Sequence, residues 1–271
     1  MVTARSGRFV MAETARRIDV LRTGPRFTAE DAAALNARFA GVPTIAMLRA
    51  VLREGLAGDV AAVSSFGAES AVLLHLIASI DRSVPVLFLD TGKHFPETLA
   101  YRDEVMKRLG MPNLVNLTPN TEALAARDEK GLRWSFDPDG CCEIRKVIPL
   151  AAALNHFDAS ITGRKGFQSG TRAGLPRFEI DRSDLAGRLK INPLVDWSSD
   201  QISAYFAATG LPAHPLVAQG YPSIGCMPCT SKVAPGEDAR SGRWKGWDKT
   251  ECGIHGEVVA ADLPPGYEPF L

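Results

Sequence analysis

Residues 59–80, DVAAVSSFGAESAVLLHLIASI, contain the pattern on which our fold prediction depends. The first part, 59–66, is an apolar run of the length of a buried strand, and 70–80 is an apolar segment of helical length. The polar, glycine-containing link between them is typical of a turn from a strand into a helix. A strand that leads directly into a helix favours an α/β fold.

The same alternation continues on both sides of this unit. The predicted strands lie at 84–89, 113–117, 160–163 and 189–191, and the predicted helices at 96–109, 141–154 and 198–208. The last helix begins with a capping box formed by Ser198 and Gln201. Strands that alternate with helices predict an α/β, Rossmann-like and mostly parallel sheet flanked by helices. In such sheets, ligands bind beyond the carboxyl ends of the strands.

Composition divides the chain into three predicted parts. Residues 1–57 form an N-terminal helical extension, in which Thr28 begins a capping box and Pro43 lies in the first turn of a second helix. Residues 58–210 form the nucleotide-binding α/β domain. Residues 211–271 contain many prolines and glycines, so we expect a loop-rich C-terminal segment.

Charge and hydropathy exclude several functional classes. The chain has 31 Lys and Arg against 31 Asp and Glu, which argues against a generally basic nucleic-acid-binding protein. No apolar run approaches the roughly 20 residues that a membrane-spanning helix needs. The arginine-rich N-terminus lacks the apolar stretch of a secretory signal. We therefore predict a cytoplasmic protein with no nucleic-acid or membrane partner.

The link between the first strand and helix is a candidate anion site. Serine hydroxyls, a glycine that permits close backbone approach, and the free N–H groups of a helix start together form a cradle for an anion. A plain turn is the alternative, because serine and glycine are common in turns. The link matches neither the phosphate-loop motif nor the GxGxxG motif. The candidate residues are Ser64, Ser65, Phe66, Gly67 and Ser70, joined at the end of the next strand by Leu89, Asp90, Thr91 and Gly92.

The five cysteines are grouped in a way that predicts chemistry. Four of them, the paired cysteines, are the adjacent Cys141 and Cys142 and the C-x-x-C of Cys226 and Cys229. Four thiolates can hold zinc or an iron–sulfur cluster. Consecutive helical side chains point about 100° apart, which suits the separate iron atoms of a cluster better than one zinc ion. Two unrelated pairs of buried thiols are the third interpretation.

The fifth cysteine, Cys252, lies in the polar segment KTECGIH near Lys249. Cations near a cysteine favour the nucleophilic thiolate, so we predict a catalytic cysteine, although Glu251 acts in the opposite direction. An inert cysteine is the alternative. Lys146 follows the adjacent pair closely and is a candidate for binding an anionic substrate, with a solvated helix face as the alternative.

Together these segments resemble the assimilatory sulfonucleotide reductases, in particular the adenylyl-sulfate reductases that use thioredoxin. The resemblance covers roughly residues 59–255. It depends on segments in a fixed order: SSFGAES (64–70), LDTG (89–92), CCEIRK (141–146), TGRKGFQSGTR (162–172), and CMPC (226–229) followed by RSGRW (240–244) and KTECGIH (249–255).

The resemblance implies an adenine nucleotide alpha-hydrolase-like fold and a role for each segment. Residues 64–70 would hold the phosphate end of the nucleotide, and residues 89–92 would line the adenosine. The paired cysteines would be the ligands of a [4Fe–4S] cluster that shapes the site rather than carrying electrons. The residues that would bind the substrate's anionic groups are Lys146, Arg164, Arg172, Arg240, Arg243 and His255.

The resemblance also implies a reaction. Cys252 would take the sulfur of adenylyl sulfate as an S-sulfocysteine, and thioredoxin or a similar dithiol protein would release sulfite for cysteine biosynthesis. Both cysteine pairs are complete, which implies adenylyl sulfate rather than 3′-phosphoadenylyl sulfate as the substrate. The alternatives are a reductase of the 3′-phosphorylated nucleotide, an ATP-dependent adenylating enzyme of the related fold, and a Cys₄ zinc module that binds nucleic acid. A homo-oligomer is compatible with the sequence.

Overall fold

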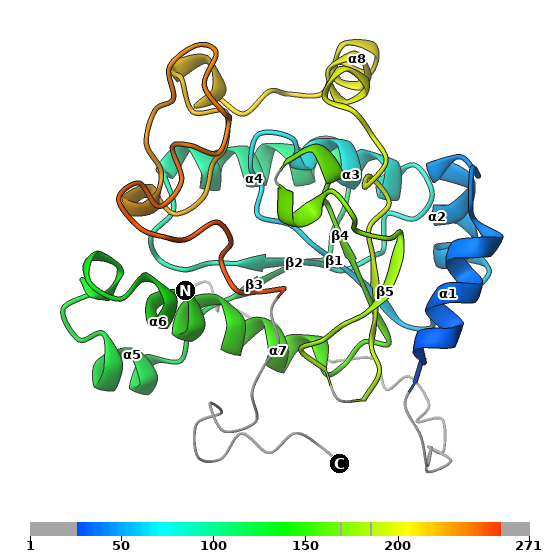
Figure 1. The fold of residues 1–271 in the computed structure, drawn as a ribbon, viewed down its shortest axis with the longest axis horizontal. Coiled ribbons are helices and arrows are strands. Elements are labelled where there is room, and N and C mark those ends of the chain that lie inside the picture. Colours follow the sequence, from blue (N-terminus) through cyan, green and yellow to red (C-terminus); the bar gives the residue numbers. More distant parts are fainter. Residues whose placement is uncertain (1–25, 169, 185, 256–271) are drawn as a thin grey trace, which may run out of the picture.

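The computed structural model describes residues 26–168, 170–184 and 186–255, which form a six-stranded sheet with helices on both faces (Figure 1). The strand order is β3-β2-β1-β4-β6-β5, and every neighbouring pair is parallel except β5 with β6. The strands are β1 (Val60–Val63), β2 (Val86–Leu89), β3 (Leu114–Leu117), β4 (Ala159–Thr162), β5 (Phe178–Ile180) and β6 (Leu189–Ile191). The predicted mostly parallel sheet is confirmed.

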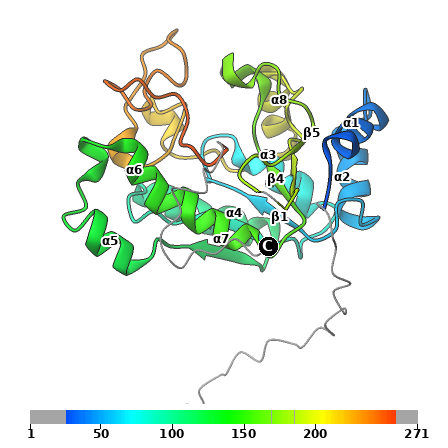
Figure 2. The same ribbon diagram turned by 60° about the horizontal axis from the view of Figure 1, so that its bottom comes forward.

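Helices cover the two faces of the sheet in two layers (Figures 1 and 2). Helices α3, α4 and α8 pack on one face, and α7 packs on the other. The helices are α1 (Ala29–Arg38), α2 (Thr44–Arg53), α3 (Ser70–Ala78), α4 (Pro96–Leu109), α5 (Thr121–Arg127), α6 (Pro138–Cys142), α7 (Ile148–Leu154) and α8 (Ser199–Thr209). None of the described helices is long and apolar enough to span a membrane.

Apolar residues on both sides of the central strands build this arrangement. Successive strand residues point to opposite faces. In β1 and β2, Ala62 and Phe88 belong to the core shared with α3 and α4, whereas Ala61 and Leu87 belong to the core under α7. A strand covered on both faces needs a continuous apolar run, which is what the sequence shows.

The N-terminal helices pack against the sheet edge. The predicted capping boxes at Thr28 and Ser198 are both present. The Asn36 side-chain amide bonds the backbone of Phe178 in β5 twice, donating at 2.7 Å and accepting at 3.0 Å. The Phe39 and Phe178 rings lie 5.6 Å apart. The segments 1–25 and 256–271, which belong to the predicted extension and tail, lie outside the described residues.

The prediction of one helix that begins at the cysteine pair is wrong in two respects. Helix α6 begins earlier, at Pro138, where the Asp137 side chain accepts the Gly140 N–H at 2.8 Å. A π-helical turn over Glu143–Val147 then separates α6 from α7. Pro149 explains the interruption, because it has no N–H to donate to the carbonyl four residues earlier and its ring crowds that carbonyl.

The topology places a binding site at a defined edge of the sheet. The chain runs from β1 outward through β2 and β3, and then returns to the other side of β1 as β4. This reversal is a topological switch point, where ligands bind beyond the carboxyl ends of the strands. The loops that follow β1 and β4 begin at Ser64 and Gly163, both of which were part of predicted motifs.

Candidate active site

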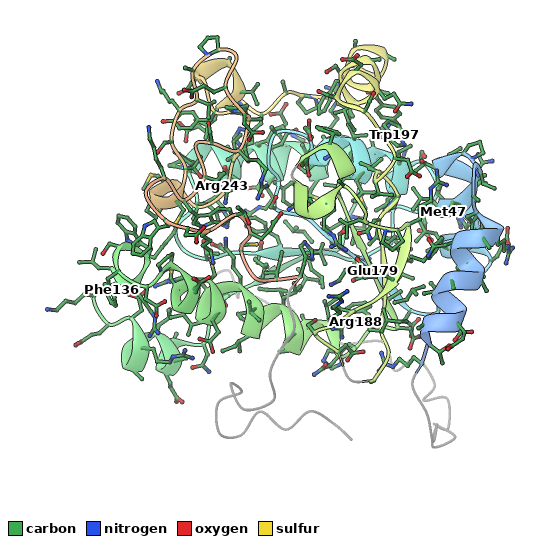
Figure 3. The ribbon with its side chains drawn as sticks, viewed as in Figure 1. Met47, Phe136, Glu179, Arg188, Trp197 and Arg243 are labelled. Carbon is green, nitrogen blue, oxygen red and sulfur yellow. The ribbon has the colours of Figure 1, made fainter. Side chains whose placement is uncertain are left out.

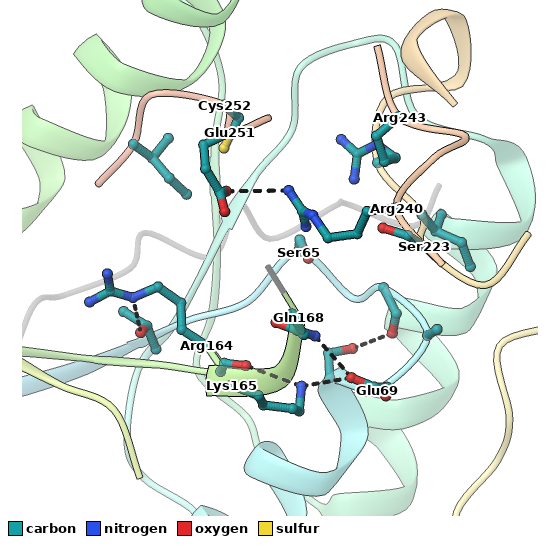
Figure 4. Close-up of a pocket in the computed structure, with 18 of the residues that line it drawn as sticks. Ser65, Glu69, Arg164, Lys165, Gln168, Ser223, Arg240, Arg243, Glu251 and Cys252 are labelled. Atoms are coloured by element: carbon teal, nitrogen blue, oxygen red, sulfur yellow. Dashed lines mark hydrogen bonds and ion pairs between the residues drawn. The ribbon is translucent and has the colours of Figure 1, made fainter. Parts of the chain in front are cut away.

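A cavity of about 290 Å³ opens beyond the carboxyl ends of β1 and β4 (Figure 4). Its walls come from the loop after β1, the loop after β4, and the loop-rich segment 222–255. Twelve predicted site residues line it: Ser64, Ser65, Gly67, Ser70, Leu89, Lys146, Arg164, Arg172, Arg240, Arg243, Cys252 and His255. Segments that are far apart in the sequence therefore meet at one cavity.

The serine-rich loop is shaped by an aromatic residue that points away from the cavity. Phe66 adopts a positive φ of 48°, is fully buried, and packs edge-on against Phe88 with ring centroids 5.5 Å apart. The Ser64 hydroxyl accepts the Phe66 N–H at 3.2 Å. With Phe66 turned into the core, Ser65 and Gly67 line the cavity. Phe66 thus shapes the loop, and its predicted contact with substrate stays a prediction.

The segment Leu89–Gly92 lies between the large cavity and the cysteines. Leu89 lines the cavity, whereas Thr91 is fully buried with its hydroxyl 3.3 Å from the Cys226 sulfur. Asp90 and Gly92 form a tight turn in which the carboxylate accepts the Gly92 N–H at 3.1 Å. Direct contact of these last three residues with adenosine stays a prediction.

The four paired cysteines line one small cavity of about 10 Å³ beneath the larger one. All five cysteines are free thiols. Burial raises the pKa of Cys142 to about 11. At Cys226, burial also acts to raise the pKa, but Lys146 and the Thr91 hydrogen bond outweigh it and the net pKa is lowered. Among the described residues, no three Cys, His, Asp or Glu side chains converge closely enough to hold one metal ion.

The π-helical turn carries the buried Arg145 and the half-buried Lys146, two cations with different partners. Arg145 donates through Nη2 and Nε to Asp128 at 2.6 and 3.2 Å, and through Nη1 to the Thr91 carbonyl at 2.8 Å. Lys146 lines both cavities. Burial acts to lower the pKa of Lys146, but the thiols of Cys226, Cys252 and Cys142 raise it above its usual range. The ammonium of Lys146 thus interacts electrostatically with both the paired cysteines and Cys252.

Cys252 is half-buried and faces the cavity from the C-terminal segment (Figure 4). Lys249 anchors this segment through an ion pair with Asp139 of α6. Gly253 follows with a φ of 83°, a conformation that favours glycine. The segment KTECGIH is therefore tied to the helix that bears the first cysteine pair.

Two of the predicted cations are already paired with the residue that precedes Cys252. Arg172 forms a bidentate contact with Glu251, with both N–O distances at 2.7 Å. Arg240 lies 3.4 Å from the same carboxylate (Figure 4). Arg243 instead lies over the ring of Trp244, 4.4 Å from its centroid. These contacts place three cations around the mouth of the cavity.

Arg164 and His255 occupy the deeper wall near β5 and β6. Arg164 donates to the Asn192 side-chain carbonyl at 2.9 and 3.2 Å and forms an ion pair with Glu179, which Figure 3 places at the β5 edge. Burial, together with the charges of Arg164 and Lys190, lowers the pKa of His255 well below its usual range. His255 was expected among the cations, and the lowered pKa favours its neutral imidazole. Its contact with substrate stays a prediction.

Comparison with known proteins agrees with this geometry. Residues 59–232 match the model of the phosphoadenosine phosphosulfate reductase domain. The chain is 49% identical over 240 residues to an adenosine 5′-phosphosulfate reductase from Mesorhizobium japonicum, covering 89% of this chain and 93% of that protein. It is 51% identical over 226 residues to one from Chelativorans sp., covering 83% and 91%. The chain belongs to the sulfonucleotide reductase family.

Solved structures support the fold of this family member. The structure of a phosphoadenylyl-sulfate reductase from Candida auris, in a phosphate complex, matches with a TM-score of 0.61 and 27% identity, covering 76% of this chain and 98% of that one. The FMN adenylyltransferase of Candida glabrata matches with a TM-score of 0.50 and 17% identity, covering 77% and 75%. The second likeness concerns the fold alone.

The structure also adds residues to the site of this sulfonucleotide reductase that were not among the predicted site residues. Glu69 accepts hydrogen bonds from Lys165 and Gln168, each at 3.0 Å, on the cavity wall. Glu251 and Trp244 organise the cations. Both lie inside recognised motifs, RSGRW and KTECGIH, so their positions in those motifs were the available signal.

Proposed function

We propose that this protein reduces adenylyl sulfate to sulfite and AMP in assimilatory sulfate reduction, through an S-sulfocysteine on Cys252. The observation that carries the proposal is the shared cavity, in which Cys252 faces the serine-rich loop together with Lys146, Arg240 and Arg243. The relatives named adenosine 5′-phosphosulfate reductase, at 43–51% identity, support the choice of substrate.

In the first step, the Cys252 thiolate attacks the sulfur of the sulfuryl group. A sulfur–sulfur bond forms, the bond from sulfur to the AMP phosphate oxygen breaks, and its electron pair leaves with AMP. An anion that attacks an anionic group meets charge repulsion, so cations placed where charge develops lower the barrier. Lys146 and the arginines at the cavity mouth supply this positive charge.

In the second step, a dithiol protein of the thioredoxin type supplies two electrons. One of its thiolates attacks the Cys252 sulfur, and sulfite leaves with the electron pair of the sulfur–sulfur bond. The second thiol of the dithiol resolves the mixed disulfide and regenerates Cys252. The half-exposed position of Cys252 supports this step, because the attacking thiol needs access to it.

The paired cysteines fit a [4Fe–4S] cluster by their chemistry. They are four free thiols from two separate segments, and all four line one buried cavity. When bound, the cluster would supply a fixed charge and a rigid support beside the substrate. Lys146 would hold its ammonium between this group and Cys252, and the Thr91 hydroxyl would contact the ligand Cys226.

The cellular setting follows from the same residues. Five free thiols suit a reducing compartment, which supports the cytoplasm as the location. Partners from solution would be adenylyl sulfate and the dithiol protein, and association of several copies of the chain stays a prediction. An ATP-dependent adenylating enzyme is disfavoured, because the loop after β1 has Phe66 immediately before Gly67, where such enzymes carry a glycine.

The test is a single-turnover reaction in the absence of dithiol. Wild-type enzyme incubated with adenylyl sulfate should gain one SO₃ group on the peptide that contains Cys252, and thioredoxin should then release sulfite. Cys252→Ser should bind the nucleotide and form no adduct. Sulfite production by the serine variant would contradict the assignment, and ATP consumption without sulfite would favour the adenylating alternative.

A further inference from the structure

We propose that Trp244 is a positioning residue that gathers the cations for the sulfuryl end of the substrate. This inference rests on the proposed function. Trp244 is only 3% exposed and lines the active-site cavity. Three cations surround its ring, with Arg243, Lys249 and Arg240 at 4.4, 5.8 and 5.9 Å from the centroid.

Lys249 also pairs with Asp139 and Arg240 with Glu251, but the like charges of the three cations still repel one another. The face of an indole ring carries negative potential and attracts cations within about 6 Å. Trp244 therefore offsets part of the repulsion without adding a formal negative charge that would compete with an anionic substrate. Glu251 offsets it differently, because its carboxylate pairs with Arg240 and Arg172 directly. The ring can keep its cations while an anion binds to them.

The backbone at this position shows that the ring is held there by its surroundings. Trp244 has a φ of 47°, and it shares a positive φ with Phe66 alone among the described residues other than glycine. A bulky residue in this region is strained, and such strain persists only where neighbouring contacts impose it. The Trp244 N–H donates to the Cys229 carbonyl at 3.1 Å, and the Trp247 N–H donates to the Trp244 carbonyl at 2.9 Å.

The residues around Arg243 also hold its side chain in place. The Arg243 Nε donates weakly to the Cys229 carbonyl at 3.4 Å. A Cβ added at Gly225 would lie 2.3 Å from Arg243 Nη2, so any other residue at this position would force the guanidinium to move. The backbone of Cys229 therefore holds Trp244 in place, and the Trp244 ring in turn holds the three cations near it. A disturbance at Trp244 should reach the cation set while leaving the nucleotide loop intact.

The prediction is a selective loss of affinity for the sulfuryl group. A ring–cation contact contributes roughly a factor of two to five in an equilibrium, so the loss of three should weaken binding about tenfold or more. In a Cys252→Ser background, Trp244→Leu should raise the dissociation constant for adenylyl sulfate by at least tenfold more than that for AMP. Trp244→Phe keeps an aromatic face and should lose less.

The matched control is Trp247→Leu, since Trp247 is 43% exposed and lies three residues away in the same segment. Its two dissociation constants should equal those of the parent. Equal losses for both nucleotides in Trp244→Leu and Trp244→Phe would indicate general damage and overturn the inference, as would no loss in either. Binding is measured without turnover, so the two proposals can fail separately. If the variants bind as expected but wild-type enzyme never forms sulfite, the proposed function is refuted and the role of Trp244 in binding is not.

Discussion

The carboxylate of Glu251 pairs with two of the arginines that are candidates for binding the anionic groups of the substrate. Glu251 holds Arg172 with two contacts of 2.7 Å and lies 3.4 Å from Arg240 (Figure 4), directly before the candidate nucleophile Cys252. A phosphosulfate group that uses these arginines has to displace the carboxylate. Glu251→Gln removes the charge with almost no change of shape, so we expect this variant to bind adenylyl sulfate more tightly.

The size of the effect follows from the burial of these groups. The side chains of Arg172, Arg240 and Glu251 are 12%, 18% and 27% exposed, so solvent screens the contacts in part. A charge-assisted hydrogen bond contributes about 1.5–3 kcal/mol, and exposure reduces this contribution. When the phosphosulfate group displaces the carboxylate, it forms most of the same contacts with Arg172 and Arg240. The net free-energy difference is therefore smaller than the energy of the contacts that Glu251 loses. A net difference of about 1.4 kcal/mol corresponds to about tenfold in the dissociation constant.

The assay is calorimetric titration of adenylyl sulfate into Cys252→Ser and into the double variant Cys252→Ser/Glu251→Gln, at two salt concentrations. Added salt should narrow the gap between them, because the contacts are electrostatic. Glu237→Gln is the matched control, since this exposed carboxylate only caps the Ala234 N–H in the same segment. Unchanged or weaker binding by the double variant would refute the displacement argument.

Three further predictions follow from other parts of the structure. Serine at any of the paired cysteines should remove iron, acid-labile sulfide and activity together, whereas zinc without sulfide in the wild type would contradict the cluster. Burial lowers the pKa of His214 to about 4, from 6.5 in the unfolded chain. The contribution of neutral His214 to folding stability is therefore fully present above pH 6.5 and is lost as the pH falls toward 4. Urea titrations should show a loss of about 2 kcal/mol from pH 7 to pH 5 that is absent in His214→Gln. Finally, kcat/KM should be much higher for adenylyl sulfate than for the 3′-phosphorylated nucleotide, and equal values would contradict the link between the cysteine pairs and substrate choice.

The sequence was sufficient to predict the central sheet because its signals are local. Each parallel strand is a short apolar run with a turn after it, and the chain continues into an apolar helix. The rule that ligands bind at the carboxyl ends also predicts that Ser64 and Leu89 lie at one edge of the sheet, whereas Arg164 was assigned by the family resemblance. The predicted strands at 59–66, 84–89 and 113–117 are longer than the observed β1, β2 and β3, whereas the prediction at 160–163 is shifted by one residue from β4 and the one at 189–191 coincides with β6.

Other elements had no such signal. Strand β5 has only three residues, includes the polar Glu179, and runs antiparallel to β6, so it shows neither the length nor the apolar run of β1 and β2. Helix α5 has seven residues and no buried one, which leaves no apolar periodicity to detect. Contacts between distant segments, such as Thr91 with Cys226, depend on the folded chain and have no local pattern at all.

The π-helical turn shows how a local constraint and a distant site are joined. Pro149 has no N–H to donate to the Arg145 carbonyl. The chain therefore makes one wider turn, in which the Ile148 N–H donates to the Glu143 carbonyl. Below the turn, α7 is fixed by its apolar side chains under the sheet. Above it, α6 carries the first cysteine pair, and Lys146 in the turn itself faces the second pair and Cys252. The sheet therefore supports the cysteines and the candidate nucleophile through one helix, and the irregular turn lies where Lys146 has to reach both.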